Sequence, residues 1–359
     1  GTGGVQWSSG LVNFTLNGTL NWIGGSPGSG SVITIASGAL LNLTNNVQRD
    51  LPTTTINNAG TVVWSAGTIT GGTGTVINNS GLWHVLGDNI FLGANLGGSS
   101  AFTNTGTFRK SVTTGTTTLS AVSFHNPSMV DIQTGTVNFA GGLTGSGTVT
   151  GNGSFQLSGS VNATINGVFN WSGGSIAGSS TLILNGNVNW TGGGFASGGS
   201  STLTILPNSI LNLTNAITRD IPGTTINNAG TVVWSAGTLT GGTGTTINNS
   251  GLWHVQGDNV FLGANLGGSS TFTNTGIFRK SVVTGTTTLS AVSFHNPSTV
   301  DIQTGTVNFA GGLTGTGSYS GAGAVQVSGN VNVTATGTMN LTGASMNSGS
   351  VLTMTAGST

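Results

Sequence analysis

Short runs in which apolar and polar residues alternate follow one another along the chain, and each run ends at a turn. Four of them read TINNAGTVVW from residue 55, VINNSGLWHV from 76, FTNTGTFRKS from 102 and FHNPSMVDIQ from 124. Alternation with a period of two, bounded by Gly, Asn and Ser, predicts half-buried β-strands joined by tight turns. No stretch predicts a helix.

The turn recurs at a nearly constant spacing. Taking Gly3 and Gly357 as the first and last turn residues, seventeen intervals span 354 positions, about 21 residues each. A coil of this size cannot bury its apolar face alone, so successive coils must stack. We therefore predict an all-β parallel β-solenoid of about 17 coils of about 21 residues, right-handed because parallel crossovers prefer that hand. A sandwich or propeller stays open, although both need hairpin signals.

A second repeat is 170 residues long. Residues 54–145 align without a gap to 224–315 and differ at eight of 92 positions. This predicts one continuous solenoid over 1–359, made of two near-identical units at about 20–189 and 190–359 plus an extra N-terminal coil.

Stacking turns each position after the turn into a column of side chains. The second and fourth positions are apolar and should face the interior, as in Val62, Trp83 and Phe108, then Trp64 and Val85. Lys110 is the exception on the fourth column. Either its strand twists outward, or its stem follows the core and its ammonium escapes at the corner.

The third position after the turn should face water, and charged residues line up there in successive coils. Arg109 should form a lateral ion pair with Asp131, which would help to fix the register. The predicted column consists of His84, Arg109 and Asp131, repeated as His254, Arg279 and Asp301.

Just before the turn, Asn recurs in four successive coils of each unit. Asn tolerates left-handed backbone geometry, and stacked amides can bond along a column. We predict an Asn ladder made of Asn58, Asn79, Asn104 and Asn126, repeated as Asn228, Asn249, Asn274 and Asn296.

Composition narrows the class of protein. The chain has 65 Gly, 35% apolar residues and 3% charged residues, against roughly 25% charged in an ordinary domain. Its net charge is zero, so nothing attracts nucleic acid or anionic lipid, and no apolar run is long enough for membrane insertion. The chain has no Cys, so packing and hydrogen bonds must provide its stability.

Catalytic chemistry is not indicated, and we expect a protein that is not an enzyme and needs no cofactor or metal. Asp50, Asp88 and Asp131 fall in different coils and columns. His84 with Asp88 and Arg109 is the one constellation that could form a site. His125 and His295 are interpreted as turn or surface groups. Asn-x-Ser/Thr triplets, which match glycan acceptors, begin at Asn13, Asn42, Asn170, Asn189 and Asn212.

Thr-rich runs such as TGTTTLS at 115–121 raise the remote alternative of an ice-binding or carbohydrate-binding solenoid. An ice-binding face needs Thr on the same two columns in nearly every coil, and TVVW and TFRK interrupt it. Sugar platforms need exposed aromatic residues, whereas the Trp residues fall mainly on interior columns and Tyr319 is the one tyrosine. Surface carbohydrate contact therefore remains a minor expectation.

The segment FTNTGTFRKSVTTGTTTLSAVSFHNPSMVDIQTGTVNFAGG, residues 102–142, resembles the strand repeats of large bacterial extracellular β-helix proteins, the autotransporter-passenger and filamentous-haemagglutinin-like group. The resemblance extends over essentially the whole chain and includes no catalytic motif. It implies an elongated structural or adhesive role outside the cell or at its surface.

Neither terminus reads as a polar cap. The start GTGGVQW places Val5 and Trp7 on interior columns, and the end TMTAGST carries Met354 and Gly357 at a turn. Joined end to end, these segments resemble one complete coil. We expect head-to-tail homopolymerisation into a filament through these four residues. The alternative is a stalk or passenger segment of a larger surface adhesin.

Overall fold

The protein folds as a parallel β-solenoid. The computed structural model describes residues 4–158, 162–343 and 345–355, and these ranges hold β-strands and no helix. The chain makes about 16 turns of roughly 21 residues, close to the 17 expected, which confirms the fold class. The right-handed sense of the coil stays a prediction.

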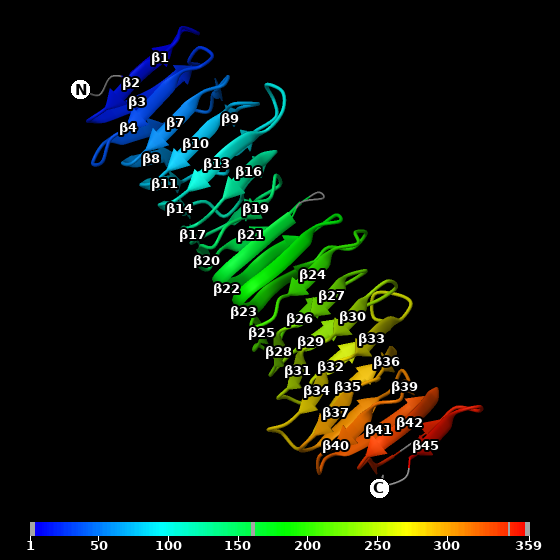
Figure 1. Cartoon of the computed structure of the whole chain (residues 1–359). Helices are drawn as coiled ribbons and strands as arrows, with labels where there is room; N and C mark the ends of the chain where they lie inside the picture. The colour runs from blue at the N-terminus through cyan, green and yellow to red at the C-terminus, as the bar shows by residue number, and fades with distance from the viewer. Residues whose placement is uncertain (1–3, 159–161, 344, 356–359) are drawn as a thin grey trace. The chain divides into compact units, whose positions relative to one another are not determined.

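The chain divides into two compact units, Gly1–Ser175 and Ile176–Thr359. This division lies before the boundary at 189/190 that the 170-residue repeat suggests, and a single continuous solenoid over 1–359 remains a prediction. Within each unit a typical coil has three short strands, and each strand pairs with its counterparts in the coils before and after it (Figure 1).

In the first unit, the strand before the turn forms the first stack: β2 (Asn13–Leu16), β4 (Val32–Ile35), β7 (Thr55–Asn58), β10 (Val76–Asn79), β13 (Ser100–Asn104), β16 (Val122–His125) and β19 (Leu143–Thr144). The strand after the turn forms the second stack: β1 (Gly4–Trp7), β3 (Thr19–Gly25), β5 (Leu40–Leu43), β8 (Thr61–Trp64), β11 (Leu82–Val85), β14 (Thr107–Lys110), β17 (Met129–Ile132) and β20 (Thr148–Thr150). The third stack is β6 (Gln48–Asp50), β9 (Thr68–Thr70), β12 (Ile90–Leu92), β15 (Thr116–Ser120), β18 (Thr136–Asn138) and β21 (Ser154–Gln156). The long β22 (Asn162–Ile176) pairs with both β19 and β20.

The second unit repeats this plan and starts with the long β23 (Thr181–Phe195). Its first stack is β24 (Thr202–Ile205), β27 (Thr225–Asn228), β30 (Thr246–Asn249), β33 (Ser270–Asn274), β36 (Val292–His295), β39 (Leu313–Gly315), β42 (Val331–Gly337) and β45 (Val351–Met354). Its second stack is β25 (Ile210–Leu213), β28 (Thr231–Trp234), β31 (Leu252–Val255), β34 (Ile277–Lys280), β37 (Thr299–Ile302) and β40 (Ser318–Ser320). Its third stack is β26 (Thr218–Asp220), β29 (Thr238–Thr240), β32 (Val260–Leu262), β35 (Thr286–Ser290), β38 (Thr306–Phe309), β41 (Ala324–Gly329) and β43 (Asn340–Leu341), and β44 (Ser345–Met346) also pairs with β41.

The strands stack without register shifts over most of each unit, so the expected columns exist. Trp83 has Val62 as its partner in the coil before it and Phe108 in the coil after it, and all three are buried. The first coil departs from this pattern. Val5 pairs with Trp22, and Trp7 pairs with Gly25, because the register shifts after Val5. The column assignment made for Val5 and Trp7 from the sequence was therefore wrong.

Aromatic rings pack against one another in the interior of both units. In the first unit Trp83 packs edge-on against Phe102 with ring centroids 5.2 Å apart, and Phe102 stacks on Phe124 at 4.8 Å. In the second unit Trp253 and Phe272 also lie at 5.2 Å, and Phe272 and Phe294 at 4.9 Å. Offset and edge-on pairs at these separations are the favoured geometries of aromatic side chains. A run of rings thus passes through part of each core, and Ile, Leu and Val fill the rest.

Glycine at the turn is required by close stacking and not by its backbone angle. A Cβ on Gly81 would lie 2.1 Å from the carbonyl oxygen of Gly60, and one on Gly106 would lie 2.1 Å from that of Gly81. Neither Gly81 nor Gly106 has a positive φ. Successive turns therefore approach so closely that a side chain there would force the coils apart.

Candidate functional site

The Asn ladder is the most extensive set of buried polar side chains. The amide Nδ2 of Asn58 donates to Oδ1 of Asn79 at 2.7 Å, Asn79 donates to Asn104 at 2.7 Å, and Asn104 donates to Asn126 at 2.7 Å. In the second unit the same bonds join Asn228, Asn249, Asn274 and Asn296 at 2.7, 2.7 and 2.8 Å. All eight side chains are buried.

Seven of the eight ladder amides also donate to a backbone carbonyl, and the Nδ2 of Asn296, which ends the second ladder, has no partner among the described residues. Asn58 reaches the carbonyl oxygen of Leu82 at 3.0 Å, and Asn79 reaches that of Thr107 at 3.1 Å. The Oδ1 of Asn58, which has no Asn in the coil before it, accepts from the backbone N–H of Gly60 at 3.1 Å. Asn therefore suits this column because its carboxamide carries two N–H donors and one oxygen acceptor. The left-handed backbone suggested from the sequence was wrong, because none of the eight has a positive φ.

The predicted charged column is present, but His84 makes its hydrogen bond to a residue outside the column. His84 lies beside Arg109, which lies beside Asp131, and Nε of Arg109 donates to Oδ2 of Asp131 at 2.8 Å. The side chain of Asp131 is 12% exposed and also accepts from Gln133 at 3.0 Å. Arg279 and Asp301 repeat the pair at 2.8 Å. Because the Arg side chains are about one third exposed, each pair contributes roughly 0.2–1 kcal/mol.

His84 bonds to a serine and not to a charged neighbour. Its Nε2 lies 2.7 Å from Oγ of Ser111, and Nε2 of His254 lies 2.7 Å from Oγ of Ser281. Burial lowers the pKa of both histidines below 6.5, and the adjacent Arg lowers it further, while the Asp of the column opposes this. A neutral histidine beside a serine can act as a base. In the second unit, Nε2 of Gln256 lies 3.4 Å from Nδ1 of His254.

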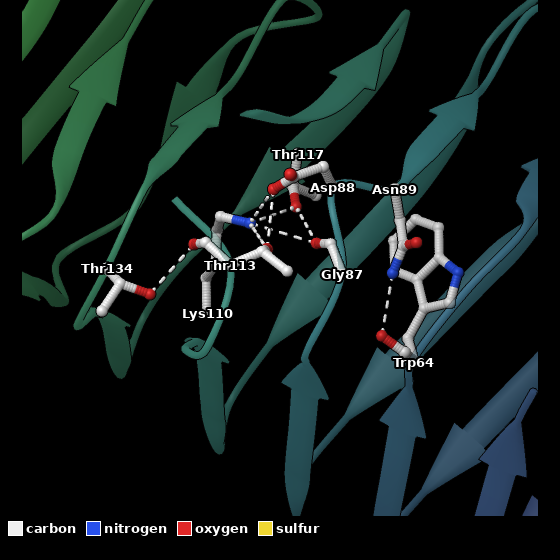
Figure 2. A network of polar contacts seen from close by, with 8 residues as sticks. All are labelled: Trp64, Gly87, Asp88, Asn89, Lys110, Thr113, Thr117 and Thr134. Carbon is white, nitrogen blue, oxygen red and sulfur yellow. Dashed lines mark hydrogen bonds and ion pairs between the residues drawn. The ribbon is translucent and has the colours of Figure 1, made fainter. Parts of the chain in front are cut away.

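Lys110 is fully buried, and neither of the two environments expected from the sequence is correct. Its ammonium stays inside the coil and donates to Oδ1 of Asp88 at 2.9 Å, the carbonyl oxygen of Gly87 at 3.1 Å, and the hydroxyls of Thr113 at 3.0 Å and Thr117 at 3.2 Å (Figure 2). These groups surround it as a cage.

Asp88 belongs to this cage and not to His84, which corrects the constellation proposed from the sequence. Its Oδ1 also accepts from Thr113 at 2.7 Å. That bond is the main reason why the pKa of Asp88 lies below its ordinary range, and the ammonium of Lys110 contributes to the same effect. Burial of the carboxylate opposes both.

In the second unit, Lys280 keeps three of these partners. Its ammonium donates to Asp258 at 3.0 Å, to the Gly257 carbonyl at 3.1 Å and to Thr287 at 3.1 Å. Val283 stands where the first unit has Thr113, so the fourth acceptor is missing.

Two buried arginines were missed by sequence reasoning. Arg49 lies on the interior column of the third stack, beside Ile69. Its Nη2 donates to the carbonyls of Trp22, at 2.7 Å, and Thr44, while the guanidinium carbon lies 5.7 Å from the centre of the Trp22 ring. Arg219 repeats this against Trp190 at 5.9 Å. Burial lowers the pKa of each to about 10, so both stay charged at neutral pH.

The signal for these arginines was present in the sequence. The triplets QRD at 48–50 and TRD at 218–220 align with TIT at 68–70 and TLT at 238–240, whose central residues face the core. These triplets lie in the third stack, away from the turn whose repeat defines the columns of the other two stacks. Asp50, which follows Arg49, accepts hydrogen bonds from Gln48 and Thr70 on the outside.

The remaining candidates are local contacts. His125 lies 3.1 Å from the hydroxyl of Thr144, and His295 lies 3.0 Å from that of Thr314. Among the glycan-type triplets, Asn42 donates to Asn21 at 2.8 Å. Within residues 4–158, 162–343 and 345–355, no group of three or more His, Cys, Asp or Glu could hold a metal ion, and no helix is long and apolar enough to cross a membrane.

The two ends of the described chain carry the residues predicted for the polymer junction. Val5 and Trp7 are half-buried, and the Trp7 ring lies 4.1 Å from that of Trp22. Met354 is 38% exposed above Ala335. Gly357 lies outside the described residues.

Comparisons with known proteins add no relative. No protein-family model matches the chain, no curated protein does, and no solved structure does. The resemblance to bacterial extracellular β-helix proteins therefore rests on the repeat sequence alone.

The Asn ladder yields a prediction with a control one residue away. Asn79→Ala should lower the free energy of unfolding by about 1–3 kcal/mol, because it leaves buried partners in the ladder unsatisfied. Asn78→Ala, which removes an exposed bond to Asn57, should change it by less than about 0.5 kcal/mol. Urea unfolding would measure both, and equal effects would contradict the ladder's role.

The burial of Lys110 and Lys280 predicts their chemical reactivity. An amine-reactive acetylating reagent should leave both lysines of the native protein unmodified, because their ammonium groups are enclosed. After unfolding in urea, the chain's two lysines should react. Mass spectrometry of peptides would locate the label, and rapid modification of either lysine in the native protein would show that the cage is open.

The lowered pKa of His84 and His254 predicts a loss of stability in acid. A folded-state pKa below the unfolded value of 6.5 means that the unfolded chain binds protons first, so stability should fall as the pH drops from 7 to 5. The double variant His84→Gln/His254→Gln should remove this part of the dependence. The midpoint of urea unfolding, measured at several pH values for both proteins, would test this prediction. If the midpoint changed with pH in the same way in the wild type and the double variant, the histidines would not be its cause.

Proposed function

We propose that the protein is an extracellular structural subunit whose coils stack head to tail with those of further copies to form a filament. The observation that carries this proposal is that the polar side chains connect successive coils. Within each unit, the ladder amides, the ion pairs and the buried cations bond from one coil to the next. Such side chains support a scaffold that extends by adding coils.

The terminal coils supply the surfaces for this stacking. Among the described residues β45 pairs with β42 alone, and its other edge could accept a strand. Its interior-facing side chains are Leu352, which is half-buried, and Met354, which is 38% exposed. Trp7 and Val5 on β1 offer apolar partners at the other end. A contact between two different ends does not close on itself, so it propagates.

An extracellular location is supported by the placement of the basic residues. Arg49, Lys110, Arg219 and Lys280 are fully buried, and Arg109 and Arg279 are held in strands by ion pairs. A trypsin-like protease needs an accessible and locally unfolded chain around Lys or Arg. The fold thus offers such proteases few sites, which suits a protein exposed outside a bacterial cell.

The second candidate is a stalk or passenger segment of a larger surface adhesin. In that case the coils that continue the stack belong to the same polypeptide. The free edges of β1 and β45 favour this arrangement and the filament equally, since both extend the solenoid by further coils.

Electron microscopy of the purified chain distinguishes the two. We expect filaments that lengthen with protein concentration. Met354→Lys should abolish them by placing a charge on an interior column, whereas Val351→Lys on the outer side of the same strand should have much less effect. Monodisperse monomers of the wild-type chain at high concentration would contradict self-assembly and favour the stalk.

A further inference from the structure

The second unit contains a hollow of about 500 Å³ at the corner that precedes the first stack of strands. Its walls come from four successive coils and include Ser197, Ser200, Gly223, Thr225, Thr243 and Leu266. Hollows of roughly 300–1,000 Å³ are the size that small ligands occupy in proteins. This one lies entirely within the second unit.

The lining is neutral and mixed in polarity. It contains no charged or aromatic side chain, and its polar groups are hydroxyls and glycine backbone. Within the described residues, the hydroxyls of Ser197, Ser200 and Thr225 make no hydrogen bond, so they are available to a ligand. Pro222 and Leu266, which is 43% exposed, provide an apolar side. This combination suits a neutral molecule with several hydroxyls and one apolar face.

The first unit carries different side chains at the equivalent corner. There the hydroxyls of Ser29 and Thr53 lie 2.6 Å apart and bond across the corner, and Thr53 also accepts from the backbone N–H of Gly30 at 2.7 Å. The positions 170 residues later are Gly199 and Gly223, which have no side chains to form this bridge. Two glycines therefore leave open in the second unit the space that a hydroxyl pair spans in the first.

We propose that this hollow binds one neutral pyranose unit of a glycan, and that Gly223 determines its presence in the second unit alone. The sugar hydroxyls would bond to Ser197, Ser200 and Thr225, and its C–H face would lie on Leu266 and Pro222. With no aromatic platform, the dissociation constant should be on the order of 1 mM. The site does not depend on filament formation, because all its residues belong to one unit.

The first unit supplies a filling substitution that the fold already accepts. Thr53 has a positive φ of 46° and Gly223 has one of 60°, so Gly223→Thr places the residue that the first unit holds in a similar, strained backbone conformation. A Cβ at Gly223 would lie 2.9 Å from the backbone carbonyl oxygen of Gly199, which is closer than ordinary Cβ contacts, so the backbone of the corner must shift to admit the side chain. Circular dichroism and the thermal midpoint would verify that the variant folds.

Saturation-transfer NMR with the methyl glycosides of glucose, galactose, mannose and N-acetylglucosamine tests the proposal. At least one glycoside should receive saturation from the wild-type protein, and Gly223→Thr should weaken its signal at least tenfold. The double variant Ser29→Gly/Thr53→Gly should open the corner of the first unit without adding a second bound glycoside, because Pro27 and Gly30 stand there in place of Ser197 and Ser200.

Three results would overturn the proposal. The wild-type protein could bind none of the four glycosides, or Gly223→Thr could bind them as well as the wild type does. Methyl glucuronide could also bind more tightly than the neutral sugars, which would require a cation that the lining does not contain. A second glycoside bound by the double variant would contradict the roles assigned to Ser197 and Ser200.

Discussion

In-register stacking of parallel strands is the constraint on which the rest of this structure depends. It places each side chain about 4.8 Å from the residue at the same position one coil away. The nearest neighbours of a residue are thus set by its column and not by its sequence neighbours. In the interior this spacing allows aromatic rings of successive coils to stack, as Phe102 and Phe124 do with centroids 4.8 Å apart. On the outside it brings unlike charges such as Arg109 and Asp131 into contact.

The same constraint explains why the buried polar column beside the turn is made of Asn. A side chain repeated along a column must donate to one neighbour and accept from the other. The carboxamide does both and keeps a second N–H for a backbone carbonyl, as Asn79 does with Thr107. A carboxylate could not donate, and a hydroxyl has only one hydrogen. A buried cation cannot repeat in this way, so Lys110 and Arg49 each need acceptors drawn from several coils.

This difference also decides what the sequence could predict. A column can be followed by counting residues from the turn. The strands, the interior aromatic residues and the order His84, Arg109, Asp131 could therefore be predicted from the sequence. The cage of Lys110 depends on Asp88 and Thr113, which lie in irregular segments after the strands, where counting stops. The columns predicted for the first coil were wrong for a related reason. The register shifts after Val5, and the repeat contains no signal for such an irregularity.

The eight differences between residues 54–145 and 224–315 show which positions the stack leaves free. Seven of the eight positions are half-buried or exposed, and two of these, Val76 against Thr246 and Ala101 against Thr271, lie on one outward column. The buried position exchanges Ile69 for Leu239, which keeps the size of the side chain. Thr113 against Val283 removes one acceptor of the lysine cage. The Asn ladder and the charged residues are identical in both units. Divergence is therefore tolerated on the outside of the stack, and in the interior where the exchange conserves volume. The corner at Thr53 and Gly223 lies just beyond the near-identical stretch, where a side chain can change without disturbing the stack. A repeated scaffold can in this way carry different surface chemistry on each of its units.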